Sequence, residues 1–270
     1  MRSPVSALVL GPGGAVGTAW MAGLAHGLRG LGIDLAAVDL VVGTSAGAIV
    51  GAALTSGQDL AHFADPAASG GDGPRPPQAD PRLMGEVFTV LGAALPPEEA
   101  RRRVGRIALD AAAPDAGQAL VATRRRLIGT DTWPAAGSRL LIPAVQAESG
   151  EPVVWDHDSG IPLAAAVAAS SAFPGAAPPV PFGGRHYIDG ALRAGSNADL
   201  AAGARTVILV EPMARQASGQ DGPAAVVSLF PDAASAAALG TDPTDLSAWV
   251  PAFRAGQRQA AAARERLAGV

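Results

Sequence analysis

Two consecutive strand-turn-helix units at the start of the chain restrict its fold more than any other feature of the sequence. The segment "VSALVL" is typical of a buried strand at about residues 5–10, and the glycine turn "GPGGAVG" leads from it into a helix that ends near Leu31. The segment "VDLVV" starts a second unit, with a strand at 39–43, the turn "GTSAG" and a helix at about 46–54. Two such units in succession predict parallel strands joined by helical crossovers, with ligands bound at the carboxyl ends of the strands.

The rest of the chain alternates between further helices, short strands and polar stretches. We expect helices at about 83–95, 97–113, 116–127, 162–172 and 251–268, and strands in "RLLIPAVQ", "PVVWDH", "RHYIDGALR" and "RTVILVEP". Asp189 would lie at the exit of the third of these strands. Residues 64–82 are rich in Gly, Pro, Asp and Ala and predict an exposed loop, whereas residues 215–248 predict a polar, irregular stretch.

Composition limits the chemistry that the chain can perform. Its 270 residues are 49% hydrophobic, which is enough for one large domain with a full core, and its net charge of −4 gives no field that would attract nucleic acid. The chain has no Cys, and all 20 residues counted as Lys or Arg are Arg. Without thiols or lysines we exclude disulfides, thiolate nucleophiles, cysteine-ligated zinc, Schiff-base chemistry and the lysine of a Walker-type phosphate loop.

The start of the chain does not predict export. Arg2 and the apolar "SALVL" resemble the beginning of a signal peptide, but "GPGG" interrupts the apolar run. An uninterrupted apolar run of about 18 residues is absent, so we expect no transmembrane helix. The sequence therefore predicts a cytoplasmic protein, for which any membrane contact would be peripheral.

Ser45 lies between the second strand and its helix, at the centre of "GTSAG". Gly43 and Gly47 permit a sharp turn that exposes the serine hydroxyl, and the adjacent helix amino terminus stabilises negative charge. These features favour Ser45 as a catalytic nucleophile. The alternative is a serine that caps the helix.

The turn "GPGGAVG" follows the neighbouring strand and would lie beside the serine turn. Its backbone amides are suited to stabilise the oxyanion of an acyl-transfer reaction. The alternative is a dinucleotide-binding fingerprint, in which Gly11, Gly13 and Gly17 approach a pyrophosphate and Asp34 or Asp39 binds a ribose. That alternative would make the chain a nucleotide-binding oxidoreductase, and it leaves the "GTSAG" turn unexplained.

The positions of the histidines argue against an α/β-hydrolase triad. In that arrangement the catalytic histidine comes late in the chain, whereas the four histidines here are His26, His62, His157 and His186. Ser45 also follows only the second predicted strand. A serine esterase assisted by His157 or His186 stays open as an alternative.

Four segments occur in a particular order along the chain: "GPGGAVG", "GTSAG", "ASSAFPGAAPPV", and "DGA" followed by "SNADLAAGA". Together they resemble the patatin-like phospholipase family, over about residues 5–55 and 160–212. The resemblance implies a three-layer α/β/α fold with a mainly parallel sheet, in a single domain over 1–270 with a helical cap at 58–135. It also implies a serine hydrolase that cleaves lipid acyl esters through an acyl-enzyme intermediate and uses no metal or organic cofactor.

The resemblance further implies the roles of individual residues. Ser45 would be the nucleophile and Asp189 its base. Burial would have to raise the pKa of this aspartate, because an ordinary carboxylate is too weak a base for a hydroxyl. The backbone amides of Gly13, Gly14 and Ala15 would form the oxyanion hole. Four further glycines would support the turns: Gly17, Gly43, Gly47 and Gly190.

Two departures from the family's glycine loop affect the expected substrate. Pro12 and Val16 stand where that loop commonly has a glycine and a basic residue. They weaken the expectation of a phospholipid head group more than the expectation of an ester. A catalytically silent acyl- or lipid-binding regulator is a further alternative.

Two groups of helical residues allow more than one interpretation. We expect solvated helix faces rather than an anion site from the arginines Arg101, Arg102, Arg103, Arg106, Arg124, Arg125 and Arg126. An apolar stripe predicts either core packing or contact with a lipid surface or acyl chain; its members are Leu83, Met84, Val87, Phe88 and Leu91.

Overall fold

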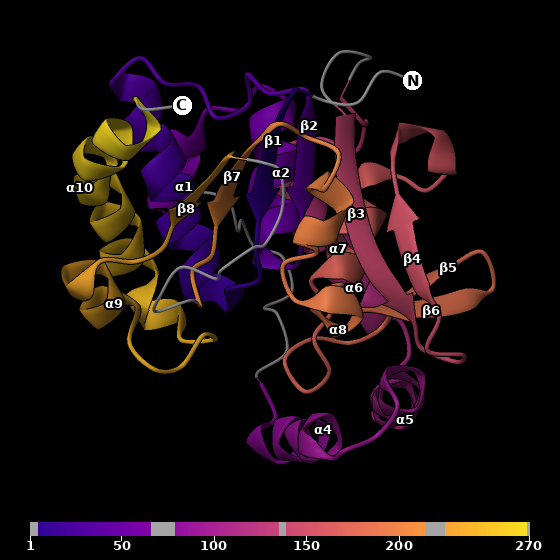
Figure 1. The fold of residues 1–270 in the computed structure, drawn as a ribbon. Helices are drawn as coiled ribbons and strands as arrows, with labels where there is room; N and C mark the ends of the chain where they lie inside the picture. Colours follow the sequence, from indigo (N-terminus) through magenta and orange to yellow (C-terminus); the bar gives the residue numbers. More distant parts are fainter. Residues whose placement is uncertain (1–4, 66–78, 135–138, 214–224, 269–270) are drawn as a thin grey trace.

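The computed structural model describes residues 5–65, 79–134, 139–213 and 225–268. Its centre is an eight-stranded sheet in the order β5-β6-β3-β2-β1-β7-β8, with β4 paired to β3 outside this path (Figure 1). The strands are β1 Ser6–Leu10, β2 Leu40–Gly43, β3 Arg139–Gln146, β4 Pro152–Trp155, β5 Val180–Phe182, β6 Arg185–Ile188, β7 Thr206–Val210 and β8 Ala225–Leu229.

The central part of the sheet is parallel. β1 pairs in parallel with β2 on one side and with β7 on the other, while β2 pairs with β3 and β7 with β8 in the same sense. β4 and β6 run antiparallel to β3, and β5 runs antiparallel to β6. The predicted mainly parallel sheet is confirmed. Because β1 and β2 are neighbours, the turns that follow them lie side by side.

Helices cover both faces of the sheet, which confirms the predicted three-layer α/β/α fold. Successive residues of β1 point to opposite faces, so Leu8 and Leu10 enter one core while Ala7 and Val9 enter another. The larger core contains α1 Gly14–Gly30, α2 Ala46–Thr55, α6 Ala116–Ile128, α7 Leu163–Ser170, α9 Ala233–Leu239 and α10 Trp249–Leu267. The opposite face is covered by α8 Ala191–Ala194 and the short helix η3 Ala198–Ala201, while α5 Pro97–Asp110 packs against the ends of β3 and β6.

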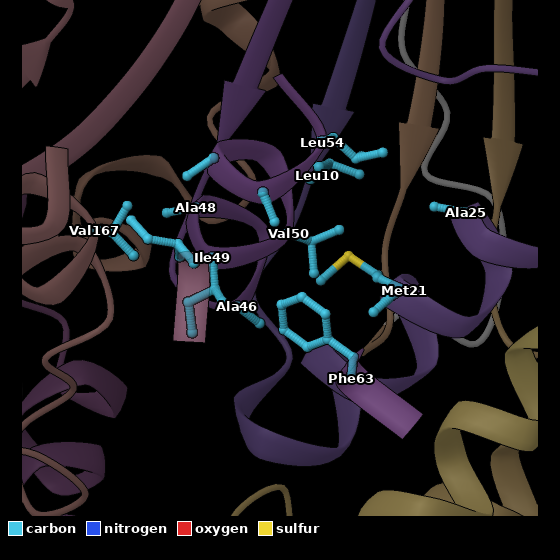
Figure 2. Close-up of a cluster of buried hydrophobic side chains, with 14 of the residues drawn as sticks. Leu10, Met21, Ala25, Ala46, Ala48, Ile49, Val50, Leu54, Phe63 and Val167 are labelled. Atoms are coloured by element: carbon cyan, nitrogen blue, oxygen red, sulfur yellow. The ribbon is translucent and has the colours of Figure 1, made fainter. Parts of the chain in front are cut away.

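The helix α2, which follows the serine turn, is buried along almost its whole length. All residues from Ala46 to Leu54 are buried, and Figure 2 shows its side chains among Met21 of α1 and Val167 of α7. Gly47 lets α2 approach β1 closely, because a Cβ at this position would lie 2.0 Å from the carbonyl oxygen of Leu10. The helix is held between the sheet and its neighbours, so the turn in front of it has little freedom to move.

The prediction of an irregular stretch at 215–248 is wrong where this stretch is described. β8 extends the sheet there, and α9 and the short helix η4 Leu246–Ala248 follow. β8 escapes sequence analysis because it is a short edge strand that acquires its backbone hydrogen bonds only by pairing with β7. The other predicted helices and strands are present with shifted ends. Most of the predicted loop at 64–82 lies outside the described residues.

Residues 58–135, the predicted cap, contribute the short helix η1 Leu60–Ala64, α4 Pro81–Gly92, α5 and α6. α6 packs against α2 and α7 as part of the larger core, whereas α4 packs against α5 beyond the end of the sheet (Figure 1). The described part of this range is therefore divided between the core and an outlying pair of helices. The assignment of residues 58–135 as a helical cap stays a prediction.

Candidate active site

The turn between β2 and α2 holds Ser45 in an unusual backbone conformation. Its φ of 56° and ψ of −115° lie in a region that residues other than glycine rarely adopt. Such a conformation costs on the order of 1–3 kcal/mol and is found mainly at functional sites. The hydroxyl makes no helix-capping hydrogen bond, so the alternative of an N-cap serine is wrong.

The Ser45 hydroxyl instead donates a hydrogen bond to a carboxylate from a distant part of the sequence. Its Oγ lies 2.7 Å from Oδ2 of Asp189, the residue that directly follows β6. The backbone N–H of Ser45 donates to Oγ of Ser170, at the end of α7, over 3.1 Å. The two residues expected to act as nucleophile and base are therefore in direct contact.

Asp189 is completely buried, and this burial raises its pKa from 3.8 to about 7. Three contacts that favour the charged form limit the increase. The N–H of Ala191 donates to Oδ1 over 2.8 Å, the Ser45 hydroxyl donates to Oδ2, and the charge of Arg124 attracts the carboxylate. A carboxylate with a raised pKa is a stronger base than an ordinary aspartate, as proton transfer from a hydroxyl requires.

Buried polar contacts join the loop that carries Asp189 to the serine turn. The side-chain amide of Asn197 donates to the Thr44 hydroxyl over 3.1 Å and to the carbonyl oxygen of Gly190 over 3.0 Å. Gly190 is required there because a Cβ would lie 2.2 Å from the carbonyl oxygen of Pro143. The only signal for Asn197 in the sequence is its place in the "SNADLAAGA" segment, which does not predict its role.

The Ser45 and Asp189 side chains line a pocket of about 460 Å³. Its apolar wall comes from α2, α6, the segment after α7 and the start of α10, through Ile49, Leu127, Phe173 and Trp249. Pockets of this size with mainly apolar walls and a few polar groups are typical of small-ligand sites. The pocket can hold part of an acyl chain beside the serine hydroxyl.

The predicted oxyanion loop reaches this pocket, but its three amides are not equivalent. The N–H of Ala15 donates to the carbonyl oxygen of Pro243 over 2.8 Å, so it is already occupied. Gly14 lines the pocket, and its N–H has no backbone acceptor among the described residues. Gly13 lies outside the pocket lining. Ala46, at the first position of α2, also lines the pocket and presents a further N–H that sequence analysis missed.

The supporting glycines lie at contacts between the two turns and their surroundings. Gly13 and Gly17 pack against Pro212, and Gly43 packs against the backbone of α2 at Gly47. Side chains at these positions would push the turns away from their neighbours. The absence of a Cβ at these positions therefore allows the close packing of the turns.

The structure assembles neither of the two alternative sites, the histidine-assisted serine esterase and the dinucleotide-binding fingerprint. All four histidines lie in the described ranges and none of them lines the pocket; His157 and His186 pair with acidic neighbours at the surface. Asp39 accepts hydrogen bonds from backbone N–H groups at the amino end of β1, and Asp34 pairs with Arg29. Because the glycine turn follows the carboxyl end of β1, Asp39 lies at the wrong end of the strand to bind a ribose beside it.

One arginine that was expected in solvent faces the pocket. Arg125 pairs with Asp131, and Arg126 is exposed, as predicted. Arg124 instead lines the pocket that contains Ser45 and Asp189, and its Nε donates to Oγ of Ser171 over 2.9 Å. The prediction of a solvated face is wrong for Arg124, because consecutive helical residues point about 100° apart and the first of these three faces inward.

Comparison with known proteins identifies the family of the chain. A model of the patatin-like phospholipase family matches residues 8–202 of the chain. The chain belongs to the patatin-like phospholipase family. Among solved structures, VipD from Legionella pneumophila is 13% identical with a TM-score of 0.47, over 99% of this chain and 67% of that chain. The type III effector protein ExoU is 17% identical with a TM-score of 0.37, over 98% of this chain and 53% of that chain. No curated protein sequence matches the chain.

Membership of the patatin-like phospholipase family makes the chain a hydrolase of the esterase and phospholipase type. The family match contains Ser45 and Asp189 but ends before Pro243, which contacts the glycine loop. Within the described ranges, no cluster of acidic and histidine side chains could hold a metal ion. No helix of this patatin-like chain, where it is described, is long and apolar enough to cross a bilayer.

Proposed function

We propose that this patatin-like chain cleaves lipid acyl esters with Ser45 as the nucleophile and Asp189 as the base. The observation that carries the proposal is the 2.7 Å hydrogen bond from the Ser45 hydroxyl to a completely buried carboxylate. The backbone strain at Ser45 and the raised pKa of Asp189 support the same roles, because both features cluster at reactive sites.

In the first step, Oδ2 of Asp189 accepts the hydroxyl proton while Oγ of Ser45 attacks the carbonyl carbon of the ester. The N–H groups of Gly14 and Ala46 and the amino terminus of α2 stabilise the oxyanion that forms. Asp189 then gives the proton to the departing alcohol, which leaves an acyl group on Ser45. Water attacks this acyl-enzyme while Asp189 accepts a proton from the water. Asp189 then returns this proton to Oγ of Ser45 as the bond to the acyl group breaks and the fatty acid departs. The Ala15 amide can join the oxyanion hole once Pro243 moves away.

A fluorophosphonate probe is expected to modify Ser45 at a rate that rises with pH through about 7. Asp189 must be ionised to accept the proton, and its pKa is raised to about 7, so the rate should fall about tenfold per pH unit in more acidic solution. Arg124 and Asp245, the other ionisable residues of the pocket lining, keep their charges through this range. Intact-mass time courses measure the rate, and peptide mapping locates the adduct.

The probe's own hydrolysis, followed in the same buffers without protein, serves as the control for this experiment. A single adduct on Ser45 with the expected pH profile would support the pair of Ser45 and Asp189. A rate that does not change between about pH 5 and 9, or an adduct on another residue, would contradict it.

We also propose that the helix α4 contacts the lipid surface from which the substrate is taken. The predicted apolar stripe divides in the structure: Val87 is buried, whereas Phe88 and Leu91 are 55% and 39% exposed. The ring of Phe88 lies 5.7 Å from that of Phe173, which lines the catalytic pocket. Leu246, which is 56% exposed, lines the pocket from η4. Exposed apolar side chains around a lipid-hydrolysing pocket are suited to enter a membrane surface.

Replacing both Phe88 and Leu91 by serine is expected to reduce liposome binding at least about tenfold, because each side chain gains roughly 1.5–3 kcal/mol when fully buried. Flotation with neutral phosphatidylcholine liposomes measures the bound fraction. Leu31→Ser is the matched control, since Leu31 is 37% exposed at the opposite end of α1 from the pocket. Equal flotation of wild type and the double variant would contradict the contact.

A further inference from the structure

Arg124 supplies the basic side chain in the described lining of the catalytic pocket. The helix α6 places it there by packing against α2 and α7. Partial burial lowers its pKa to about 10, and the charge of Asp189 opposes this change, so the guanidinium stays cationic at neutral pH. The pocket therefore combines a serine hydroxyl with a positive charge.

The guanidinium of Arg124 is held by a hydrogen bond at its Nε, whereas its other nitrogens have no partner among the described residues. Its Nε donates to the Ser171 hydroxyl, which donates in turn to the carbonyl oxygen of Ala168 over 3.3 Å. Its remaining N–H groups have no hydrogen-bond acceptor and no ion pair in the part of the chain that the structure describes, whereas its neighbour Arg125 pairs with Asp131. A partly buried cation without a paired anion is unfavourable, and a bound anion would relieve this.

Other charged groups of the pocket are already engaged. Both oxygens of Asp189 accept hydrogen bonds. Oδ1 of Asp245 accepts from the N–H and the hydroxyl of Ser247 at 2.8 and 2.7 Å. The glycine loop adds no cation, because Val16 stands where the family commonly has a basic residue. Val16 also faces a separate cavity of about 500 Å³. Arg124 is thus the side chain in this pocket that is available to an anion.

We propose that Arg124 sets the substrate specificity by binding an anionic group, a phosphate or a carboxylate, that the substrate carries next to its scissile ester. This role rests on the proposed function, because the anion would lie in the pocket where Ser45 attacks. The free N–H groups of a guanidinium match two oxygens of such an anion. Ile49, Leu127 and Phe173 receive the acyl chain, so the ester lies between an apolar wall and the cation.

The test compares two esters that differ in one group, 1-oleoylglycerol and 1-oleoylglycerol 3-phosphate, in the same detergent micelles. Wild type is expected to have the higher kcat/KM for the phosphorylated ester. Arg124→Gln is expected to reduce the ratio of the two kcat/KM values about 10- to 100-fold, mainly through KM for the phosphorylated ester. Arg126→Gln, at an exposed position two residues along the same helix, is the matched control and should leave the ratio unchanged.

A second variant protects the test against misfolding of Arg124→Gln. Ser171→Ala keeps the guanidinium but removes the hydroxyl that holds its Nε, so it should reduce the same ratio by a smaller factor. Inorganic phosphate, added during hydrolysis of the neutral ester, distinguishes two sources of the anion. Inhibition of wild type that Arg124→Gln abolishes would show that free phosphate suffices. A substrate preference without such inhibition would show that the phosphate must be attached to the lipid.

Labelling of Ser45 separates this inference from the proposed function. An unchanged ratio in Arg124→Gln and Ser171→Ala variants that still label at Ser45 would overturn the role of Arg124 and leave the proposed function standing. A wild-type protein that hydrolyses neither ester and does not label at Ser45 would overturn both.

Discussion

Ser45→Ala is expected to lower kcat/KM for p-nitrophenyl ester hydrolysis by about 10⁴- to 10⁶-fold. The substitution removes the atom that attacks the carbonyl and leaves the backbone of the turn in place. The pocket and the oxyanion amides would remain, so substrate binding should change little. Steady-state rates, with the variant at high concentration to detect residual turnover, measure the loss.

Ser56→Ala is the matched control for this substitution. Ser56 lies at the other end of α2, and its hydroxyl is buried without a hydrogen-bond partner among the described residues, so its removal should cost neither activity nor stability. Equal rates for wild type and Ser45→Ala would favour the silent lipid-binding regulator over the enzyme.

Asp189→Asn is expected to lower kcat by about 10²- to 10⁴-fold, the range usually supplied by a general base. An amide keeps the shape of the carboxylate but cannot accept the hydroxyl proton. Rates for the same p-nitrophenyl esters at about pH 8 measure this loss. Full activity in Asp189→Asn together with its loss in His186→Ala would contradict the assignment of the base.

The same variant should be more stable than wild type in alkaline solution. Burial raises the pKa of Asp189 from 3.8 to about 7, so the folded state binds this proton more tightly than the unfolded state does. The stability that comes from the protonated form is fully present below pH 3.8 and is lost as the pH rises through about 7. Above this pH, the ionised carboxylate lowers the free energy of unfolding by at most about 4 kcal/mol. Asparagine carries no charge and avoids this loss.

Urea unfolding at about pH 4 and about pH 8.5 checks this difference. The free energies of unfolding of wild type and Asp189→Asn should nearly agree at the lower pH, and the variant should exceed wild type at the higher one. A constant difference between them at both pH values would show that Asp189 does not titrate between these conditions.

The strand-turn-helix plan and the contact between the two proposed reacting residues could be predicted from the sequence. The signal for each glycine turn is local, because the strand, the turn and the start of the helix all lie within one short stretch of sequence. Asp189 was predictable through the order of the segments that resemble the family, because no rule of spacing brings it to Ser45 across more than 140 residues. Its burial raises its pKa to about 7, as the proposed role as base requires.

The residues that sequence analysis missed depend on packing between elements. Arg124 is one of three adjacent arginines, and only the rotation of α6 against the core selects the one that enters the pocket. Asn197 acts through hydrogen bonds to two separate turns. Pro243, which occupies the Ala15 amide, comes from a stretch that shows no periodic pattern. None of these contacts has a local signal in the sequence.

The contact between Pro243 and the glycine loop has a consequence for the order in which the chain folds. Pro243 reaches Ala15, and α10 packs along α1 so closely that a Cβ on Gly256 would lie 2.1 Å from the carbonyl oxygen of Trp20. During synthesis, the outer side of α1 therefore stays uncovered until α10 has been made. A ribosome-bound nascent chain that carries both Ser45 and Asp189 but ends before α10 still lacks part of the pocket wall, so we expect hydrolytic activity only after the segment from Thr244 to Trp249 has been made.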